Sequence, residues 1–151
     1  MTQDRPLSRA EAQDTETPLR DAIEALSEGF AVYDADHRLV TFNRAYAEMF
    51  SAIEDKIVPG ITWEDLLYAG ARRGLYTHAV GRVDEWHREV LAGGLPLGEH
   101  RIIHHTDGSV YDTCLHPTSV GGFVVIRTEI TEQHRAETGE RERDAMLQAG
   151  L

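Results

Sequence analysis

The sequence predicts a single α+β domain in which one five-stranded antiparallel sheet carries short helices on one face. Two β-rich segments before residue 43 and three after residue 99 enclose a central region with helical periodicity. The chain has 151 residues, of which 41% are apolar. That length is sufficient for one hydrophobic core and too short for two.

The composition argues against several classes of partner. The net charge is -11, from 26 acidic and 15 basic residues, whereas nucleic acids and anionic membranes attract basic surfaces. Apolar runs such as 123–126 are far shorter than the ~20 residues of a spanning helix, and residues 1–18 lack the apolar stretch of a signal peptide. One cysteine, Cys114, excludes an internal disulfide and a zinc site built from cysteine pairs. We therefore expect a cytoplasmic chain that binds no nucleic acid and inserts in no membrane.

The N-terminal region divides into a polar arm and a helix. Residues 1–16 have no hydrophobic period, which is typical of disorder. Thr17 and Pro18 are favoured at the N-cap and first position of a helix, which we expect over 17–28. Its apolar residues have the i, i+3, i+4, i+7 spacing of an amphipathic helix: Leu19, Ala22, Ile23 and Leu26.

The next elements are a hairpin and three short helices. β-rich runs over 29–33 and 38–42 flank a polar turn, and Asn43 is a suitable N-cap for a helix over 44–50. Thr62 and Asp65 have the spacing of a capping box. The two further helices are expected over 63–73 and 83–91.

The last third returns to strand and then to helix. Asp107-Gly108 is a strong hairpin signal between strands expected over 100–106 and 109–116. A short apolar run fits a buried strand over 123–128, and residues 132–151 have a helix-forming composition.

This order of elements resembles the PAS fold of bacterial sensory proteins over about residues 19–136. Three segments carry the resemblance. Gly29–Asn43 is similar to the family's opening hairpin and helix-capping Asn, Asp107–Tyr111 to a later hairpin, and Arg127–Glu132 to the Asp-Ile-Thr signature after the last strand. The resemblance implies a PAS core over 29–131, of the type found beside histidine kinases and diguanylate cyclases.

Two residues depart from the family pattern. His37 stands where the family usually has Gly in the first turn, and His is one of the few other residues that adopt positive φ. We therefore expect a strained or reshaped turn. Glu129 replaces the family's Asp and moves the carboxylate one methylene further out. By resemblance, Glu129, Ile130 and Thr131 form the segment through which a signal leaves the domain.

A ligand site is expected between the sheet and the helices, where the family binds its ligands. Tyr111, Thr113 and Leu115 share one face of their strand, and either Arg101 or His100 joins them, depending on the hairpin register. The two hydroxyls can form hydrogen bonds, and Arg101 can pair with a carboxylate. The identity of a cofactor or ligand stays open.

His87 has two interpretations. It lies beside Val83 and Leu91 on the apolar side of its helix, where haem-binding relatives place an iron ligand, so haem is one option. The alternative is a boundary histidine with a local hydrogen bond. No metal site is expected in the 100–116 hairpin, because His100 and His104 are separated by roughly 13 Å along a strand.

The sequence favours signalling over catalysis. It has no Gly-x-Ser-x-Gly, His-Glu-x-x-His or phosphate-binding glycine loop. One alternative is a ligand-free PAS dimerisation module. Another is a small α+β-barrel enzyme, which would need an inward acid or base with a shifted pKa, and Asp112 or His116 would be the candidates.

The terminal helices indicate the partners. The stripe of the 17–28 helix is too short to fold alone and must pack on its own sheet or on a second chain, and we expect a homodimer. We interpret the 132–151 helix as a connector to a kinase or cyclase output domain in the same or a partner chain.

Overall fold

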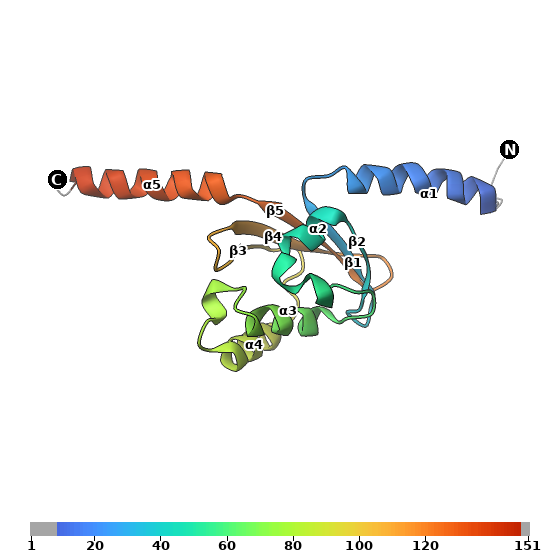
Figure 1. The fold of residues 1–151 in the computed structure, drawn as a ribbon, viewed down its shortest axis with the longest axis horizontal. Coiled ribbons are helices and arrows are strands. Elements are labelled where there is room, and N and C mark those ends of the chain that lie inside the picture. The colour runs from blue at the N-terminus through green and yellow to red at the C-terminus, as the bar shows by residue number, and fades with distance from the viewer. Residues whose placement is uncertain (1–8, 149–151) are drawn as a thin grey trace.

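The computed structural model describes residues 9–148, and it consists of one sheet with helices on one face and a helix extending from each end (Figure 1). Its elements are α1 (Arg9–Glu24), β1 (Gly29–Tyr33), β2 (Leu39–Phe42), α2 (Arg44–Met49), η1 (Ser51–Lys56), α3 (Trp63–Arg72), η2 (Thr77–Ala79), α4 (Val83–Ala92), β3 (His100–His104), β4 (Val110–Pro117), β5 (Phe123–Glu129) and α5 (Thr131–Gln148). The expected α+β class and the PAS order of elements are therefore confirmed.

The sheet has the strand order β2-β1-β5-β4-β3, and all neighbours are antiparallel. β5 comes last in the chain but lies at the centre, between β1 and β4. Its inner face is formed by Phe123, Val125 and Arg127, which are buried while their neighbours along the strand are more exposed. The central strand of the sheet is thus also the one that leads into α5.

The core lies between this inner face and the helices. Apolar side chains from α2, η1 and α3 pack against those of β1 and β5. Tyr46, Ile53 and Leu66 of the helices and Val125 of β5 belong to one buried cluster. A Cβ at Gly29 would lie 2.8 Å from the Sδ of Met49, so glycine at this position allows α2 to approach β1 closely.

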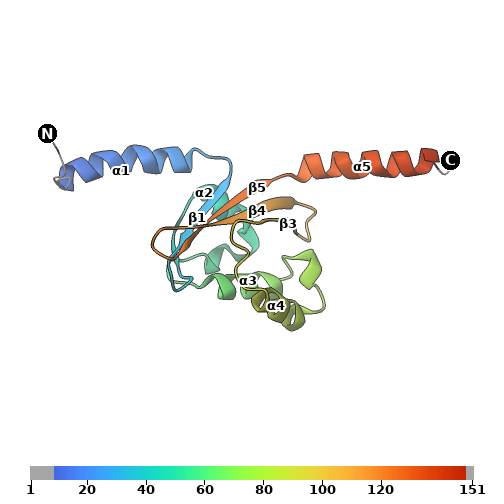
Figure 2. The ribbon, with the colours of Figure 1, turned by 180° about the vertical axis from the view of Figure 1, so that it is seen from behind.

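Helices α1 and α5 extend from the domain in opposite directions, as views from both sides show (Figure 2). No helix of residues 9–148 is long and apolar enough to cross a membrane.

Two of the three expected N-caps are present, at Asn43 and Thr62. The Oδ1 of Asn43 accepts from the Tyr46 amide at 3.0 Å, and the Oγ1 of Thr62 accepts from the Asp65 amide at 3.1 Å. The turn at His37 has φ 63°, which confirms the positive φ expected there. Short polar caps and turns are local interactions, and the sequence predicts them well.

The N-terminal helix differs from the expectation. It begins at Arg9, inside the range expected to be disordered, and ends at Glu24, so Thr17 and Pro18 lie within it. Residues 9–16 contain Ala, Glu, Gln and Arg, which favour helix even without a hydrophobic period. The rest of the expected arm, residues 1–8, lies outside the described residues, as do residues 149–151 of the expected C-terminal helix.

The two 3₁₀ segments η1 and η2 were not expected. They are six and three residues long, too short to establish a hydrophobic period. The remaining elements differ from the expected ranges by a few residues at their ends, where hydrogen bonding frays.

Candidate functional site

A cavity of about 340 Å³ lies between the inner face of the sheet and helices α3 and α4. Most of its wall is apolar, with Phe50, Trp63, Leu66, Trp86 and Leu115 among the lining residues. Apolar walls with a few polar groups are typical of small-molecule sites. The polar groups of this wall therefore decide what the site can do.

The principal polar group is Arg127, in the middle of β5. Its side chain is 2% exposed, and it lines the cavity opposite Thr113 of β4. No carboxylate of the described residues forms an ion pair with it. Burial therefore lowers the pKa of Arg127 from its ordinary value, although arginine stays protonated in proteins.

Aromatic rings and one histidine surround this guanidinium. Its carbon lies 4.1 Å from the ring centroid of Phe50 and 4.5 Å from that of Tyr111, within the range of cation–π attraction. Its Nη2 donates to the Nε2 of His105 at 3.0 Å. Desolvation, and then the charge of Arg127, lower the pKa of His105 to about 4, so the ring is neutral at pH 7 and accepts this hydrogen bond.

Three tyrosine hydroxyls near Arg127 do not neutralise its charge. Burial raises the pKa of Tyr33, Tyr46 and Tyr76 above the ordinary value, so all three remain protonated at neutral pH. The hydroxyls of Tyr33 and Tyr46 bond to each other at 2.9 Å.

Three buried polar atoms at this site have no hydrogen-bond partner. They are the Nε of Arg127, the hydroxyl of Tyr76 and the Oγ1 of Thr113, and all three residues line the cavity. Native structures pair nearly all buried polar atoms, and unpaired ones are costly. The wall thus combines an uncompensated positive charge with unused hydrogen-bonding capacity.

The exit from β5 is fixed to the neighbouring strand. Thr131 Oγ1 accepts from the Val110 amide at 3.0 Å and donates to the carboxylate of Glu129 at 2.8 Å. The Ile130 amide donates to the Val110 carbonyl at 2.8 Å. The longer Glu129 side chain therefore still reaches Thr131, at the start of α5.

Comparison with known proteins identifies the family. The family profile described as the PAS fold matches residues 23–138 of this chain. The chain belongs to the PAS family. As a PAS domain it is a sensory and signalling module.

Individual relatives are distant from this PAS domain. It is 30% identical over 154 residues to the non-motile and phage-resistance protein of Caulobacter vibrioides, and the match covers 100% of the chain but 17% of that protein. It resembles a domain of a sensory box sensor histidine kinase/response regulator from Geobacter sulfurreducens, with 18% identity, a TM-score of 0.46, and coverage of 80% of this chain and 98% of that one. An RNA-binding light-oxygen-voltage receptor aligns with 19% identity and a TM-score of 0.50, and the alignment covers 99% of this chain and 42% of the receptor.

Three of the residues expected at the ligand site line the cavity of this PAS domain: Arg101, Thr113 and Leu115. The β3–β4 register places Arg101 opposite Thr113, which settles the choice between Arg101 and His100. Arg101 is exposed and donates to Glu99 at 2.7 Å, whereas Tyr111 contacts Arg127 and does not line the cavity.

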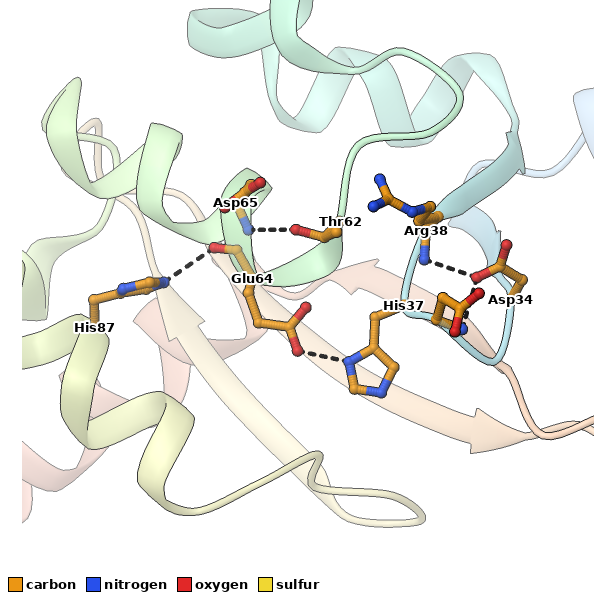
Figure 3. Close-up of polar contacts among 8 residues, drawn as sticks. Asp34, His37, Arg38, Thr62, Glu64, Asp65 and His87 are labelled. Carbon is orange, nitrogen blue, oxygen red and sulfur yellow. Dashed lines mark hydrogen bonds and ion pairs between the residues drawn. The ribbon is translucent and has the colours of Figure 1, made fainter.

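His87 does not line the cavity. A ring nitrogen of His87 bonds to the backbone carbonyl of Glu64 at 3.1 Å (Figure 3). This bond corresponds to the second interpretation of His87, a boundary histidine with a local hydrogen bond. The ring of His87 also packs on that of Tyr68. Glu64 also contacts His37 through its carboxylate, at 2.6 Å, so one residue of α3 links the first turn to α4.

The candidates of the enzyme alternative are also outside the cavity. Asp112 lies between Tyr111 and Thr113 in β4, so its side chain is on the other face of the sheet. There it pairs with His100 at 2.8 Å. His116 is exposed. Within the part of the chain described by the structure, no group of His, Cys, Asp or Glu could hold a metal ion.

We did not predict from the sequence that Arg127 lines the cavity or that it bonds to His105. In the sequence, Arg127 belongs to the segment that resembles the exit signature. Its signal was present in the alternation of β5, where Phe123, Val125 and Arg127 fall on the same face. A basic residue at an inward position of a buried strand is the pattern that could have revealed the site.

Proposed function

We propose that this PAS domain binds a small molecule in the cavity and transmits its occupancy to α5 through β5. The proposal rests on one observation: the strand β5 both lines the cavity and leads into α5. β5 contributes Val125 and Arg127 to the cavity wall, and two residues after Arg127 it ends in the segment that is bonded to the start of α5.

The mechanism requires two packings of β5 and α5 with different ligand affinities, because a ligand shifts an equilibrium only by its differential affinity for the two states. A ligand in contact with Arg127 would favour one position of the strand. The bonds between Glu129, Thr131 and Val110 would carry that position to the first turn of α5.

The receiver of the signal would be an output domain, such as a histidine kinase or diguanylate cyclase, in the same or a partner chain. The chain spans 17% of the length of its curated relative, which leaves ample length for other domains in such proteins. In this proposal the PAS domain itself catalyses no reaction.

We further propose a homodimer formed through α1. Leu19 of α1 is 60% exposed, and α1 extends away from the core (Figure 1). Leu26, which was expected in the same stripe, lies two residues beyond the end of α1 and is 43% exposed. A 16-residue helix with an uncovered apolar stripe is marginal in water, and pairing with a second copy would bury that stripe.

The ligand proposal is tested by filling the cavity. Val90 of α4 lines it, and Val90→Trp would occupy the space from the helix side. Leu91→Trp is the matched control, because Leu91 is 41% exposed on the same helix and does not line the cavity.

Native mass spectrometry of protein purified from cells provides the readout. We expect extra mass on the wild type and on Leu91→Trp, and none on Val90→Trp. An unmodified mass for the wild type would contradict the ligand proposal and favour the ligand-free dimerisation module.

A further inference from the structure

We propose, on the basis of the ligand-binding function above, that the cavity takes a small organic carboxylate whose negative charge pairs with Arg127. The ligand would be an aromatic or branched aliphatic monocarboxylic acid. Three features of the cavity support this ligand: the charge of Arg127, the unpaired N–H donor of its guanidinium, and the volume and polarity of the remaining space.

The charge of Arg127 is uncompensated in the protein alone. The side chain is 2% exposed, and the guanidinium has no carboxylate partner among residues 9–148. A buried ion without a counter-ion is strongly unfavourable. The attraction of the Phe50 and Tyr111 rings offsets part of that cost, and a ligand carboxylate would offset more.

The other charged residues at the cavity already have partners. Both carboxylate oxygens of Glu89 accept from Nη2 of Arg82 at 2.6 Å. Arg101 donates to Glu99 at 2.7 Å. Among the described lining residues, Arg127 is therefore the charge that a ligand can neutralise without breaking an ion pair.

The geometry of the guanidinium leaves a donor for an acceptor ligand. The guanidinium carbon lies over the Phe50 and Tyr111 rings, at 4.1 and 4.5 Å from their centroids, and the guanidinium carries five N–H donors. His105 accepts one of these, and Nε has no partner. Thr113, opposite Arg127 across the two strands, has a further unpaired hydroxyl.

The rest of the wall selects the body of the ligand. It is mostly apolar and includes Trp63, Leu66, Trp86 and Leu115. At the packing density of protein interiors, about 340 Å³ accommodates roughly 10–15 non-hydrogen atoms. A dianion or a sugar would bring charges or hydroxyls that this wall does not match.

The test compares acids with their neutral isosteres. The probes are 4-phenylbutanoate and naphthalene-2-carboxylate, each beside its primary amide, titrated into the isotopically labelled full chain and followed by NMR chemical shifts. We expect each acid to bind roughly 10- to 100-fold more tightly than its amide, because the hydrogen bonds to Arg127 are charge-assisted.

Arg127→Met is the decisive variant. The variant removes a buried charge that has no counter-ion among the described residues, and such a charge is costly, so the variant is expected to fold. It should lose the preference for acid over amide while still binding the apolar body. Arg72→Met, at an exposed position of α3 outside the cavity, is the control and should keep the preference.

The outcomes separate this inference from the proposed function. If acid and amide bind equally to the wild type and Val90→Trp abolishes both, the cavity binds ligands and the carboxylate inference is wrong. The inference also fails if Arg127→Met keeps the preference, or if the copurifying molecule is neutral. If no probe binds and no added mass is found, both proposals fail.

Discussion

At the scale of the residue, the most unusual feature is the contact between Arg127 and His105. A buried cation next to a histidine is tolerated because the histidine is neutral, and Arg127 itself helps to keep it so. Protonation of His105 would remove the acceptor of the Arg127 hydrogen bond and place two positive charges together.

This contact predicts a pH-dependent stability. The pKa of His105 is about 4 in the folded protein and has its ordinary value of 6.5 in the unfolded chain, so the unfolded chain binds the proton more readily. The contribution of neutral His105 to the free energy of unfolding is complete above pH 6.5, and it is lost as the pH falls from 6.5 towards 4. By pH 5 the loss amounts to about 2 kcal/mol.

His105→Gln isolates this effect, because glutamine offers an acceptor that does not titrate. Urea unfolding at pH 7 and pH 5 should show a smaller loss of stability for the variant than for the wild type. Parallel losses in the two proteins would mean that other groups cause the acid sensitivity.

A second residue-scale prediction concerns Gly122. A Cβ at this position would collide with the backbone carbonyl of Tyr33, so Gly122→Ala must displace the β4–β5 turn or β1. We expect a loss of about 1–3 kcal/mol in the free energy of unfolding.

Gly139→Ala is the control, because nothing lies within 4 Å of a Cβ there in α5. It should be neutral or stabilise the helix by up to about 1 kcal/mol. Chemical denaturation measures both variants, and equal effects would contradict the predicted steric conflict.

At the scale of the element, Asn43 joins three segments. It is 1% exposed, and its Oδ1 accepts from the amides of Phe30 and Tyr46 at 2.9 and 3.0 Å. Its Nδ2 donates to the carbonyls of Ile23 and Glu28, both at 3.0 Å. One side chain therefore caps α2, holds β1 and anchors the C-terminal end of α1.

Asn43→Asp should separate these roles. The carboxylate keeps both acceptor contacts but loses both donor contacts, and it repels the carbonyls of Ile23 and Glu28. We expect amide hydrogen exchange over residues 20–28 to accelerate by about tenfold or more, since each lost hydrogen bond is worth about 1 kcal/mol. Exchange in β1 and α2 should change less.

Asn43→Ala provides the comparison, because it removes all four contacts and should accelerate exchange in all three segments. If the Asp and Ala variants behave identically, Asn43 does not anchor α1 through its amide group.

Elements differ in how well the sequence predicts them. The caps at Asn43 and Thr62 and the hairpin at Asp107-Gly108 depend on neighbours a few residues away, so their patterns are readable. The start of α1 at Arg9 and the two 3₁₀ segments have no such pattern.

At the scale of the whole molecule, the proposed dimer makes a prediction about the state of assembly. If α1 pairs with a second copy, a charge in its apolar stripe should favour the monomer. Leu19→Asp introduces that charge at a side chain that is 60% exposed in the single chain.

Val120→Asp is the matched control, at a side chain that is 80% exposed in the β4–β5 turn. Light scattering after size-exclusion chromatography should give a dimer mass for the wild type and Val120→Asp and a lower mass for Leu19→Asp at the same concentration. A monomeric wild type would refute the dimer.

The sequence by itself determined the types and order of most elements, the α+β class and the resemblance to PAS domains, because these follow from periodicity, caps and turns. Only the tertiary structure decided which residues form the site. The β3–β4 register placed Arg101 beside Thr113, and His87 bonded to Glu64 away from the cavity. Arg127 became a buried cation through the pairing of β5 with β1 and β4. Those pairings join residues far apart in the chain. The alternation along β5 indicates that Arg127 faces inward, but no local pattern shows which rings and hydroxyls the pairings bring beside it.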